Sequence, residues 1–225
     1  MERWEWLIDE RIGIWQDPAL GCFSEDSIAL AHFLRMRADD TVLDIGAGNG
    51  VLCLYAQGLY GGRFTGIDTN ESQIALAQRS AQRNGQPIRF LGMRAEDAPD
   101  RFGHGVFSRV IMNPPYFTQG DAGRRAEARH ADANLLSDWC RAAFLVLNNG
   151  GTLTLCYPAD RLAALFRALD QNRLAPKRME LLLTGQRARL VLAEAKKLGA
   201  DGLAVTVRQT KRTPPPQAER IGVQV

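Results

Sequence analysis

The 225-residue chain contains few cysteines, few histidines and no long apolar run. Its four cysteines, Cys22, Cys53, Cys140 and Cys156, show neither Cys-x-x-Cys spacing nor the density of a disulfide scaffold. A disulfide-rich secreted fold is therefore excluded, and we expect the cysteines to be small buried apolar side chains. The three histidines are widely separated, so no metal site is expected.

Membrane and fibrous classes are excluded as well. The longest strongly apolar run, Ala142 to Leu147, is too short to cross a bilayer. The first residues interleave charges with tryptophans and lack the apolar core of a secretory signal. With 45% hydrophobic, 24% charged and 8% aromatic residues, the composition is that of an ordinary globular domain. The sequence predicts a cytoplasmic protein with no membrane partner.

The net charge of +3 is small but unevenly distributed. Residues 177–225 hold ten Lys or Arg against four Asp or Glu, whereas residues 1–176 are slightly acidic. This asymmetry suits an enzymatic body with a basic end that faces a polyanion. The alternative is a soluble, basic sheet edge without a partner, and the charge distribution alone leaves both open.

Strand and helix patterns alternate over the middle of the chain. Strand patterns recur at 41–45, 63–68, 88–93, 109–112 and 152–157, with helical patterns between them at 51–59, 70–84, 133–147 and 160–170. The second helix has Asn70 as its N-cap, and Gly85 is positioned to end it. This alternation predicts an α/β, Rossmann-like fold with a mostly parallel central sheet and helices on both faces.

The pattern changes after Pro176. Strands follow one another at 179–183, 190–195 and 203–207, with a Gly199-Ala-Asp-Gly turn between the last two. These short connections predict an antiparallel C-terminal finish to the sheet.

A glycine-rich run, residues 43–50, covers the end of the strand predicted at 41–45 and the turn that follows it. Glycines let the backbone approach a ligand closely, and the following helix offers its N-terminus. A dinucleotide fingerprint would need a glycine just after this run, where the chain has valine. Gly46, Gly48 and Gly50, preceded by Asp44, instead match the loop of S-adenosylmethionine-dependent methyltransferases. The alternative is a tight strand-to-helix turn without a ligand.

Two carboxylates follow the next strands. Ligands of open α/β sheets bind beyond the carboxyl ends of the strands, where Asp68 is placed to accept both ribose hydroxyls of the cofactor. Asp97 follows the third strand, with Ala98 beside it, and we expect it to accept a hydrogen bond from the adenine amine. Taken alone, Asp97 also fits a helix cap.

The run Asn113-Pro114-Pro115-Tyr116 follows the fourth strand. A rigid proline-rich turn accounts for the prolines but not for the residues on either side of them. The run resembles that of methyltransferases acting on a planar nitrogen, either adenine N6 or a glutamine amide. We expect the Asn113 side-chain oxygen and the Pro114 carbonyl to accept the two amine hydrogens. Tyr116 is expected to stack on the target ring.

The chain resembles the bacterial tRNA adenine-N6 methyltransferase family, whose members modify the adenosine adjoining the valine anticodon. The resemblance rests on Gln16, on residues 23–33, on residues 113–117 and on Ala128-Arg-His. It covers most of the chain up to about Pro176. It implies transfer of a methyl group from S-adenosyl-L-methionine to the N6 amine of an adenosine in tRNA(Val).

This resemblance implies one methyltransferase domain over residues 1–225. The domain comprises an N-terminal segment (1–40), a cofactor-binding and catalytic core (41–176), and basic C-terminal strands with a tail (177–225). An RNA enzyme has to hold phosphates around the target nucleotide. The basic residues expected to do so are Arg124, Arg125, Arg129, His130, Lys196 and Lys197.

Other functions share part of this pattern. Release-factor glutamine-N5 methyltransferases have a similar glycine loop and Asn-Pro-Pro-Tyr run, but a helical domain normally precedes them, and only about 40 residues precede Thr41. Ribosomal RNA and DNA adenines are further acceptors, of which DNA is disfavoured because no separate recognition domain is evident. From a different class, the chain could be an RNA-binding protein on a methyltransferase scaffold. The intact Asp44, Asp68 and Asn113 argue against that.

Overall fold

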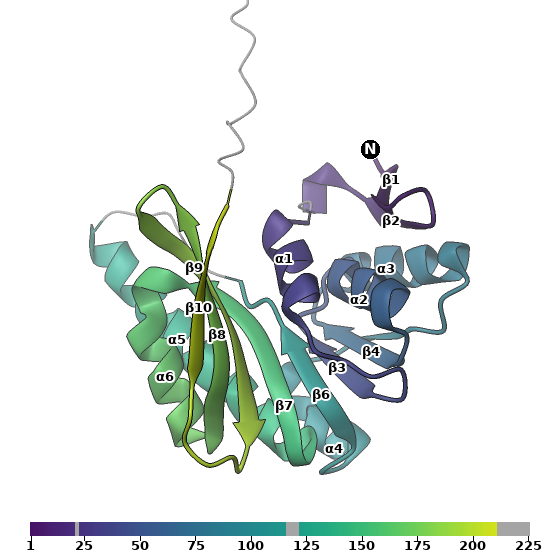
Figure 1. Ribbon diagram of the computed structural model, residues 1–225. Helices are drawn as coiled ribbons and strands as arrows, with labels where there is room; N and C mark the ends of the chain where they lie inside the picture. The colour runs from purple at the N-terminus through teal and green to yellow at the C-terminus, as the bar shows by residue number, and fades with distance from the viewer. Residues whose placement is uncertain (21–22, 116–121, 211–225) are drawn as a thin grey trace, which may run out of the picture.

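The structure is a computed structural model that describes residues 1–20, 23–115 and 122–210, with the backbone alone described over 122–133. An eight-stranded sheet forms its centre, with helices on both faces (Figure 1). The strands of this sheet are β3 (Thr41–Ile45), β4 (Arg63–Asp68), β5 (Arg89–Gly92), β6 (Phe107–Met112), β7 (Leu147–Pro158), β8 (Leu174–Thr184), β9 (Arg187–Lys197) and β10 (Ala204–Gln209).

The spatial order of the strands is β10-β8-β9-β7-β6-β3-β4-β5. Strands β3 to β7 pair in parallel, which confirms the predicted parallel core. β9 pairs antiparallel to both β7 and β8, so the antiparallel finish is confirmed for that strand. The carboxyl ends of the five parallel strands therefore share one edge of the sheet, where ligands of such sheets bind.

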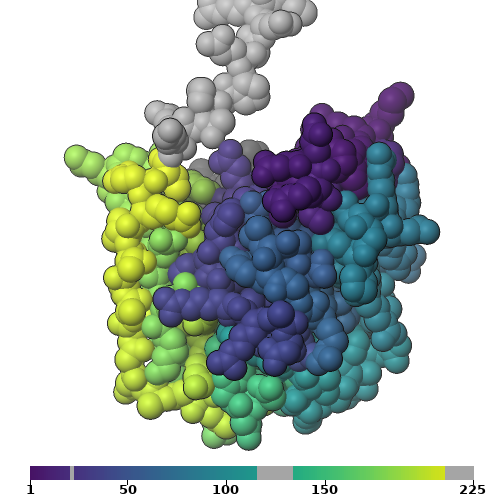
Figure 2. Space-filling model, turned by 45° about the vertical axis from the view of Figure 1, so that its right-hand side comes forward, coloured from purple at the N-terminus to yellow at the C-terminus, as the bar shows by residue number. Residues whose placement is uncertain are grey.

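The last strand departs from the prediction. The turn at Gly199 predicts a strand that returns beside β9, but β10 instead crosses to the far side of β8 and pairs with it in parallel. It forms the outer edge of the sheet (yellow in Figure 2). Because strand pairing depends on distant parts of the chain, a turn signal does not determine which neighbour the strand takes.

Side chains alternate between the two faces of the sheet, which gives two cores. One core packs against α1 (Glu25–Phe33), α2 (Val51–Tyr60) and α3 (Glu71–Asn84). The other packs against α4 (Ala98–Phe102), α5 (Ala122–Val146) and α6 (Leu162–Gln171). Three short 3₁₀ segments, η1 (Pro18–Leu20), η2 (Ala95–Asp97) and η3 (Ala159–Arg161), connect these elements.

Helix α3 has the predicted ends. The Asn70 side-chain oxygen accepts a hydrogen bond from the Gln73 backbone N–H at 3.1 Å. Gly85 ends the helix with φ +66°, a backbone conformation that favours glycine. Helix α5 starts earlier than the predicted residue 133, but it ends at Val146, just before the Asn-Asn-Gly-Gly run.

The N-terminal hairpin of β1 (Arg3–Ile8) and β2 (Ile12–Gln16) is not among the predicted elements. The hairpin packs on α3, where the Trp15 backbone N–H donates to the Ser80 hydroxyl at 2.9 Å. The Arg83 guanidinium lies 4.1 Å from the centre of the Trp4 ring. At its end the buried Gln16 accepts from the Phe23 backbone N–H at 3.0 Å. The hairpin thereby holds the segment that leads into α1.

Three of the cysteines are buried and unlinked, as predicted: Cys53, Cys140 and Cys156. Cys22 lies outside the described residues. In the described part of the chain, no helix has the length and apolar character needed to span a membrane.

Candidate active site

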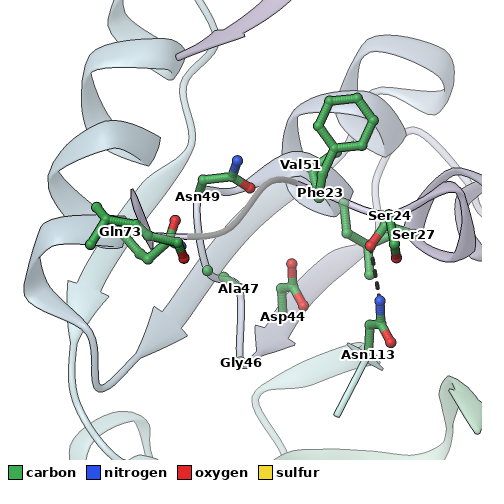
Figure 3. Close-up of a pocket in the computed structure, with 13 residues that line it drawn as sticks. Phe23, Ser24, Ser27, Asp44, Gly46, Ala47, Asn49, Val51, Gln73 and Asn113 are labelled. Atoms are coloured by element: carbon green, nitrogen blue, oxygen red, sulfur yellow. Dashed lines mark hydrogen bonds between the residues drawn. The ribbon is translucent and has the colours of Figure 1, made fainter. Parts of the chain in front are cut away.

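The carboxyl edge of the sheet brings the glycine loop, Asp44, Asp68 and Asn113 together around two adjoining cavities. The smaller cavity, of about 220 Å³, lies beside Asp44 and is shown in Figure 3. The larger, of about 580 Å³, lies beside Asp68. Gly46, Gly48 and Asn113 line both cavities. The glycine loop after β3 and the asparagine after β6 thus meet where the two cavities join.

The Asp68 carboxylate holds the glycine loop in place and also faces the larger cavity. One oxygen accepts from the Gly48 backbone N–H at 2.9 Å, and the other accepts from the Asn70 backbone N–H at 2.8 Å. A carboxylate offers about four acceptor positions, so positions remain for a ligand's hydroxyl groups.

The glycines of the loop are required by its conformation. Gly46 has φ +75°, and a Cβ there would lie 2.5 Å from the Trp139 ring of α5. Gly50 has φ +84°, and its Cβ would lie 2.7 Å from the Phe90 ring. Gly48 has φ +53° but open space around it, on the side that faces the cavities. The loop is therefore packed at two glycines and left open at the third.

Asp44 is buried beneath the smaller cavity, with 1% of its surface exposed. Burial raises the pKa of its carboxyl to about 7, and the negative charge of Asp68 acts in the same direction. The Cys53 thiol donates to the carboxylate at 3.3 Å and partly opposes that rise in pKa. A cation bound in the cavity would therefore stabilise the charged form of Asp44.

Asn113 is held by side chains from two other elements. Its amide nitrogen donates to the hydroxyl of Ser27 on α1 at 2.9 Å (dashed line in Figure 3). The Cys156 thiol of β7 donates to its amide oxygen at 2.9 Å. The amide is thereby oriented at the junction of the cavities. Pro114 is buried, Pro115 lines the larger cavity, and Tyr116 lies outside the described residues.

The structure does not bring Asp97 and Ala98 to the cavity. Asp97 is exposed and Ala98 is wholly buried in the core below α5. The cavity wall after β5 is formed instead by residues 93–96, ending in Glu96, which pairs with Arg94 at 3.2 Å. Because the short η2 turn begins directly after β5, the residues that face the cavity come one or two positions earlier in the sequence than predicted.

Two of the residues predicted to contact RNA lie away from the site. Lys196 pairs with Thr152 in the amino-terminal half of β7, toward the sheet edge opposite Asn113. Lys197 is buried, and its ammonium donates to the Leu147 carbonyl at 2.6 Å. The antiparallel direction of β9 carries both lysines away from the site. The side chains of Arg124, Arg125, Arg129 and His130 lie outside the described residues.

The side chains lining the cavities that sequence reasoning missed include Ser27, Asn49, Gln73 and Trp139. Ser27 lies in the segment that carried the family resemblance, and Asn49 lies within the glycine loop. Gln73 and Trp139 lie on helices, where a lone polar or aromatic residue is indistinguishable from ordinary surface or core. In the described part of the chain, no cluster of His, Cys, Asp or Glu could hold a metal ion.

Comparison with known proteins identifies the family. Residues 18–164 match the model of the methyltransferase small domain. The chain belongs to the methyltransferase small domain family. A relative from Shewanella baltica (strain OS185), named tRNA1(Val) (adenine(37)-N6)-methyltransferase, is 28% identical over 67% of this chain. The match covers 66% of that relative, slightly less than two thirds of its length.

Solved structures show the same fold. A predicted O-methyltransferase from Agrobacterium tumefaciens has a TM-score of 0.67 and 22% identity, over 82% of this chain and 86% of that one. TrmN from Thermus thermophilus has a TM-score of 0.63 and 26% identity, over 76% of this chain and 48% of that one. The fold is that of class I methyltransferases, and S-adenosylmethionine is the cofactor of this methyltransferase domain.

Proposed function

We propose that the protein transfers a methyl group from S-adenosylmethionine to the exocyclic N6 amine of an adenosine in RNA, and that this RNA is tRNA(Val), at the adenosine adjoining the anticodon. The observation that carries the proposal is Asn113, followed by two prolines, at the junction of the two cavities. The name of the Shewanella baltica relative supports the choice of acceptor.

The residues of the site fit this cofactor. The larger cavity has room for an adenosine, with Asp68 positioned to accept hydrogen bonds from the ribose hydroxyls. Ala95 and Glu96, in place of the expected Asp97 and Ala98, are the candidates for contact with the adenine. Gly48 leaves the space a ligand needs to approach the backbone closely.

The catalytic groups act by orientation. S-adenosylmethionine, when bound, supplies an electrophilic methyl group on a sulfonium. An exocyclic amine is a weak nucleophile because its lone pair is delocalised into the ring. The Asn113 side-chain oxygen and the Pro114 carbonyl accept its two hydrogens, which localises the lone pair and directs it at the methyl group. The methylated nitrogen is strongly acidic while it carries a positive charge and loses its extra proton to water, so no strong general base is required, and the sulfonium leaves as a neutral thioether.

Ser27 and Cys156 position Asn113 for this function. The Ser27 hydroxyl accepts from the amide nitrogen, which fixes the orientation of the amide at the junction of the cavities. The Cys156 thiol donates to the amide oxygen, so the amide is held at both of its polar atoms. Tyr116 stacks on the extruded base in this proposal.

The RNA is held on the side of the site where α5 begins. Arg124, Arg125, Arg129 and His130 follow the catalytic run in the sequence, in the first turns of α5. Phosphate contacts from such residues release counterions and give binding its salt dependence. Lys196 and Lys197 have no part in this footprint, because Lys196 lies toward the opposite edge of the sheet and Lys197 is buried.

The test is to identify the methyl acceptor. The protein is incubated with labelled S-adenosylmethionine and either total unmodified RNA or a release-factor protein, and the modified residue is identified by mass spectrometry. We expect N6-methyladenosine in the RNA and no label in the protein. Methylglutamine without methyladenosine would assign the protein-modifying activity instead. Binding of RNA with no methyl transfer to either acceptor would assign a binding function.

A further inference from the structure

The central sheet ends on β10, and no other strand of the described chain pairs with the outer side of this strand. β10 pairs with β8 alone, in a register that runs without a shift from Ala204 to Gln209. Every residue of β10 is exposed, including Val205 at 53% and Val207 at 60%. The strand forms the yellow margin of the molecule in Figure 2. The sheet therefore ends in a regular strand that is open to solvent on both faces and along one side.

The margin at the other end of the sheet is protected. Its strand, β5, has only four residues, and the Gln78 amide nitrogen of α3 donates to the Phe90 carbonyl at 3.1 Å. Short length, exposed charges, prolines and bulges are the usual protection of edge strands. β10 has no proline, and its one charged side chain, Arg208, is paired with Glu180 of β8 at 2.6 Å. Its open side is thus left without such protection.

One contact shows which backbone groups face this open side. The Thr210 backbone N–H donates to the Leu183 carbonyl of β8 at 2.9 Å, so the backbone groups of Thr210 face inward. The N–H and C=O groups of successive strand residues point alternately to the two sides. Those of Val205, Val207 and Gln209 therefore face outward. A row of donors and acceptors at this spacing is a template for another extended strand.

A second copy of the same strand matches this row. Two antiparallel copies of β10 with a two-fold axis at Val207 place Val207 opposite itself and Val205 opposite Gln209, and each such pair exchanges two backbone hydrogen bonds. On the other face Thr206 lies opposite Arg208, so no like charges meet. An axis at Arg208 would keep the hydrogen-bonding pattern but set two arginines opposite each other. The charges therefore favour the register centred on Val207.

We propose that β10 pairs with β10 of a second copy of this chain and joins the two sheets into one continuous sheet. The pairing satisfies the outward backbone groups and removes the exposed valines from water. β10 runs parallel to β8 and hence to β7, so the two-fold axis directs the carboxyl edges of the two copies in opposite directions. Each copy keeps its own cavities, and the proposal does not rest on the proposed function.

Opposite charges at Val207 test the pairing. Val207→Lys and Val207→Glu each place two like charges opposite each other on the axis, whereas a mixture of the two variants places opposite charges there. Val106→Lys is the matched control, because Val106 is an apolar residue of the loop before β6 with 47% exposure. Sedimentation measures the mass of each full-length protein from micromolar to submillimolar concentration, and circular dichroism checks its fold.

We expect the wild-type protein and Val106→Lys to reach the mass of two chains as the concentration rises. Each Val207 variant should dimerise at least about tenfold more weakly, because it loses the contact between valines and gains a repulsion. An equimolar mixture of Val207→Lys and Val207→Glu should recover the dimer. Methyl transfer by Val207→Glu should equal that of the wild-type protein, since the cavities lie away from β10.

A covalent link gives a second readout if the charged variants misfold. Paired Cα atoms in a hydrogen-bonded antiparallel pair lie about 5.5 Å apart, which suits a disulfide. Mild oxidation should therefore link two copies of Val207→Cys, as seen on a non-reducing gel, and should not link Val106→Cys.

Three results would overturn the proposal. One is a wild-type protein that keeps the mass of a single chain over the whole concentration range. Another is a dimer that persists in both charged variants, or that their mixture fails to restore while Val207→Cys stays unlinked. The third is a monomer that dimerises only after residues 211–225 are deleted, which would assign the open side of β10 to the chain's own C-terminal segment.

Discussion

The carboxylate of Asp68 joins the structure of the glycine loop to the proposed binding of the cofactor. Its two oxygens accept from the backbone of Gly48 and Asn70, and it also lines the larger cavity. A single substitution therefore disturbs both the loop and the ligand. All of these hydrogen bonds have the same charged acceptor, but the loop also packs at Gly46 and Gly50 against Trp139 and Phe90. We therefore expect the effect on the ligand to be the larger one.

Asp68→Ala should chiefly weaken cofactor binding. Each hydrogen bond to the charged acceptor is worth about 1.5–3 kcal/mol, so an affinity loss of at least about tenfold is expected. Calorimetry with S-adenosylhomocysteine measures it. An unchanged affinity would remove Asp68 from the cofactor site.

Asp44 should make the stability of the unliganded protein depend on pH. Its pKa in the folded protein is about 7, above the ordinary value of 3.8, because burial disfavours the charged form. Its contribution to the free energy of unfolding is therefore fully present below about pH 4 and is lost as the pH rises toward 7. The wild-type protein should lose stability over this range, by on the order of a few kcal/mol, relative to Asp44→Asn.

Denaturant unfolding of both proteins at several pH values measures this difference. Parallel curves for the wild-type protein and Asp44→Asn would show that Asp44 stays charged at neutral pH.

At the scale of elements, the loop between β3 and α2 is constrained in two different ways. Gly46 is closed in by the Trp139 ring, whereas Gly48 faces open space. Both have positive φ, so both are strained by any side chain. The difference between them lies in packing against α5.

Gly46→Ala should therefore destabilise the protein more than Gly48→Ala. We expect about 1 kcal/mol for the conformational strain at Gly48, and an additional 1–3 kcal/mol, roughly, for displacing Trp139 at Gly46. Thermal or denaturant unfolding of the two variants gives the comparison. Equal losses of stability would mean that the Trp139 ring moves aside freely.

Elements with local signals could be predicted from the sequence, and elements that depend on distant contacts could not. Asn70 and Gly85 define α3 through caps within a few residues of each end, and both caps are predicted correctly. The pairing of β10 with β8 depends on residues far apart in the chain, so the turn at Gly199 is misleading. The N-terminal hairpin likewise depends on its packing against α3.

The same distinction applies to the site. The loop at 46–49, Asp68 and Asn113 have signatures in residue type and spacing, and the structure places all of them at the cavities, whereas Gly50 packs against Phe90 instead. The prediction for Asp97 fails because a short turn decides which residue after β5 faces the ligand. Lys196 and Lys197 lie away from the cavities because net charge does not say which edge of a sheet a residue occupies.

At the scale of the whole molecule, we expect the two edges of the sheet to differ in RNA binding. The carboxyl edge carries the cavities, and α5 follows the catalytic run there in the sequence. Lys196 lies toward the opposite edge, where the parallel strands begin, which we call the amino edge. Replacing Arg124, Arg125 and Arg129 together by Ala should weaken RNA binding and leave cofactor affinity unchanged. The salt dependence should also flatten, because the slope of log K against log salt falls by about 0.7–0.9 for each phosphate that is no longer neutralised.

A matched control removes three positive charges from the amino edge. Arg63, Arg89 and Lys196 are exposed there, and their replacement by Ala should change RNA binding far less. RNA affinity is measured at several salt concentrations for both triple variants. A salt slope that is unchanged in the first variant, or equally reduced in the second, would place the RNA footprint elsewhere.

In the proposed function, Asn113 directs a methyl group to the N6 amine of one adenosine in tRNA(Val). The most direct measurement is position-resolved mass spectrometry of a tRNA(Val) transcript after reaction with S-adenosylmethionine and either the wild-type protein or Asn113→Ala. A transcript with guanosine in place of the adenosine adjoining the anticodon is treated in the same way. We predict N6-methyladenosine at that position with the wild-type protein and not with Asn113→Ala, and no methylation of the guanosine transcript by either protein. Asn113→Ala should still bind S-adenosylhomocysteine normally. Methylation that persists in the Asn113→Ala variant, or that falls on another atom or another molecule, would contradict the account.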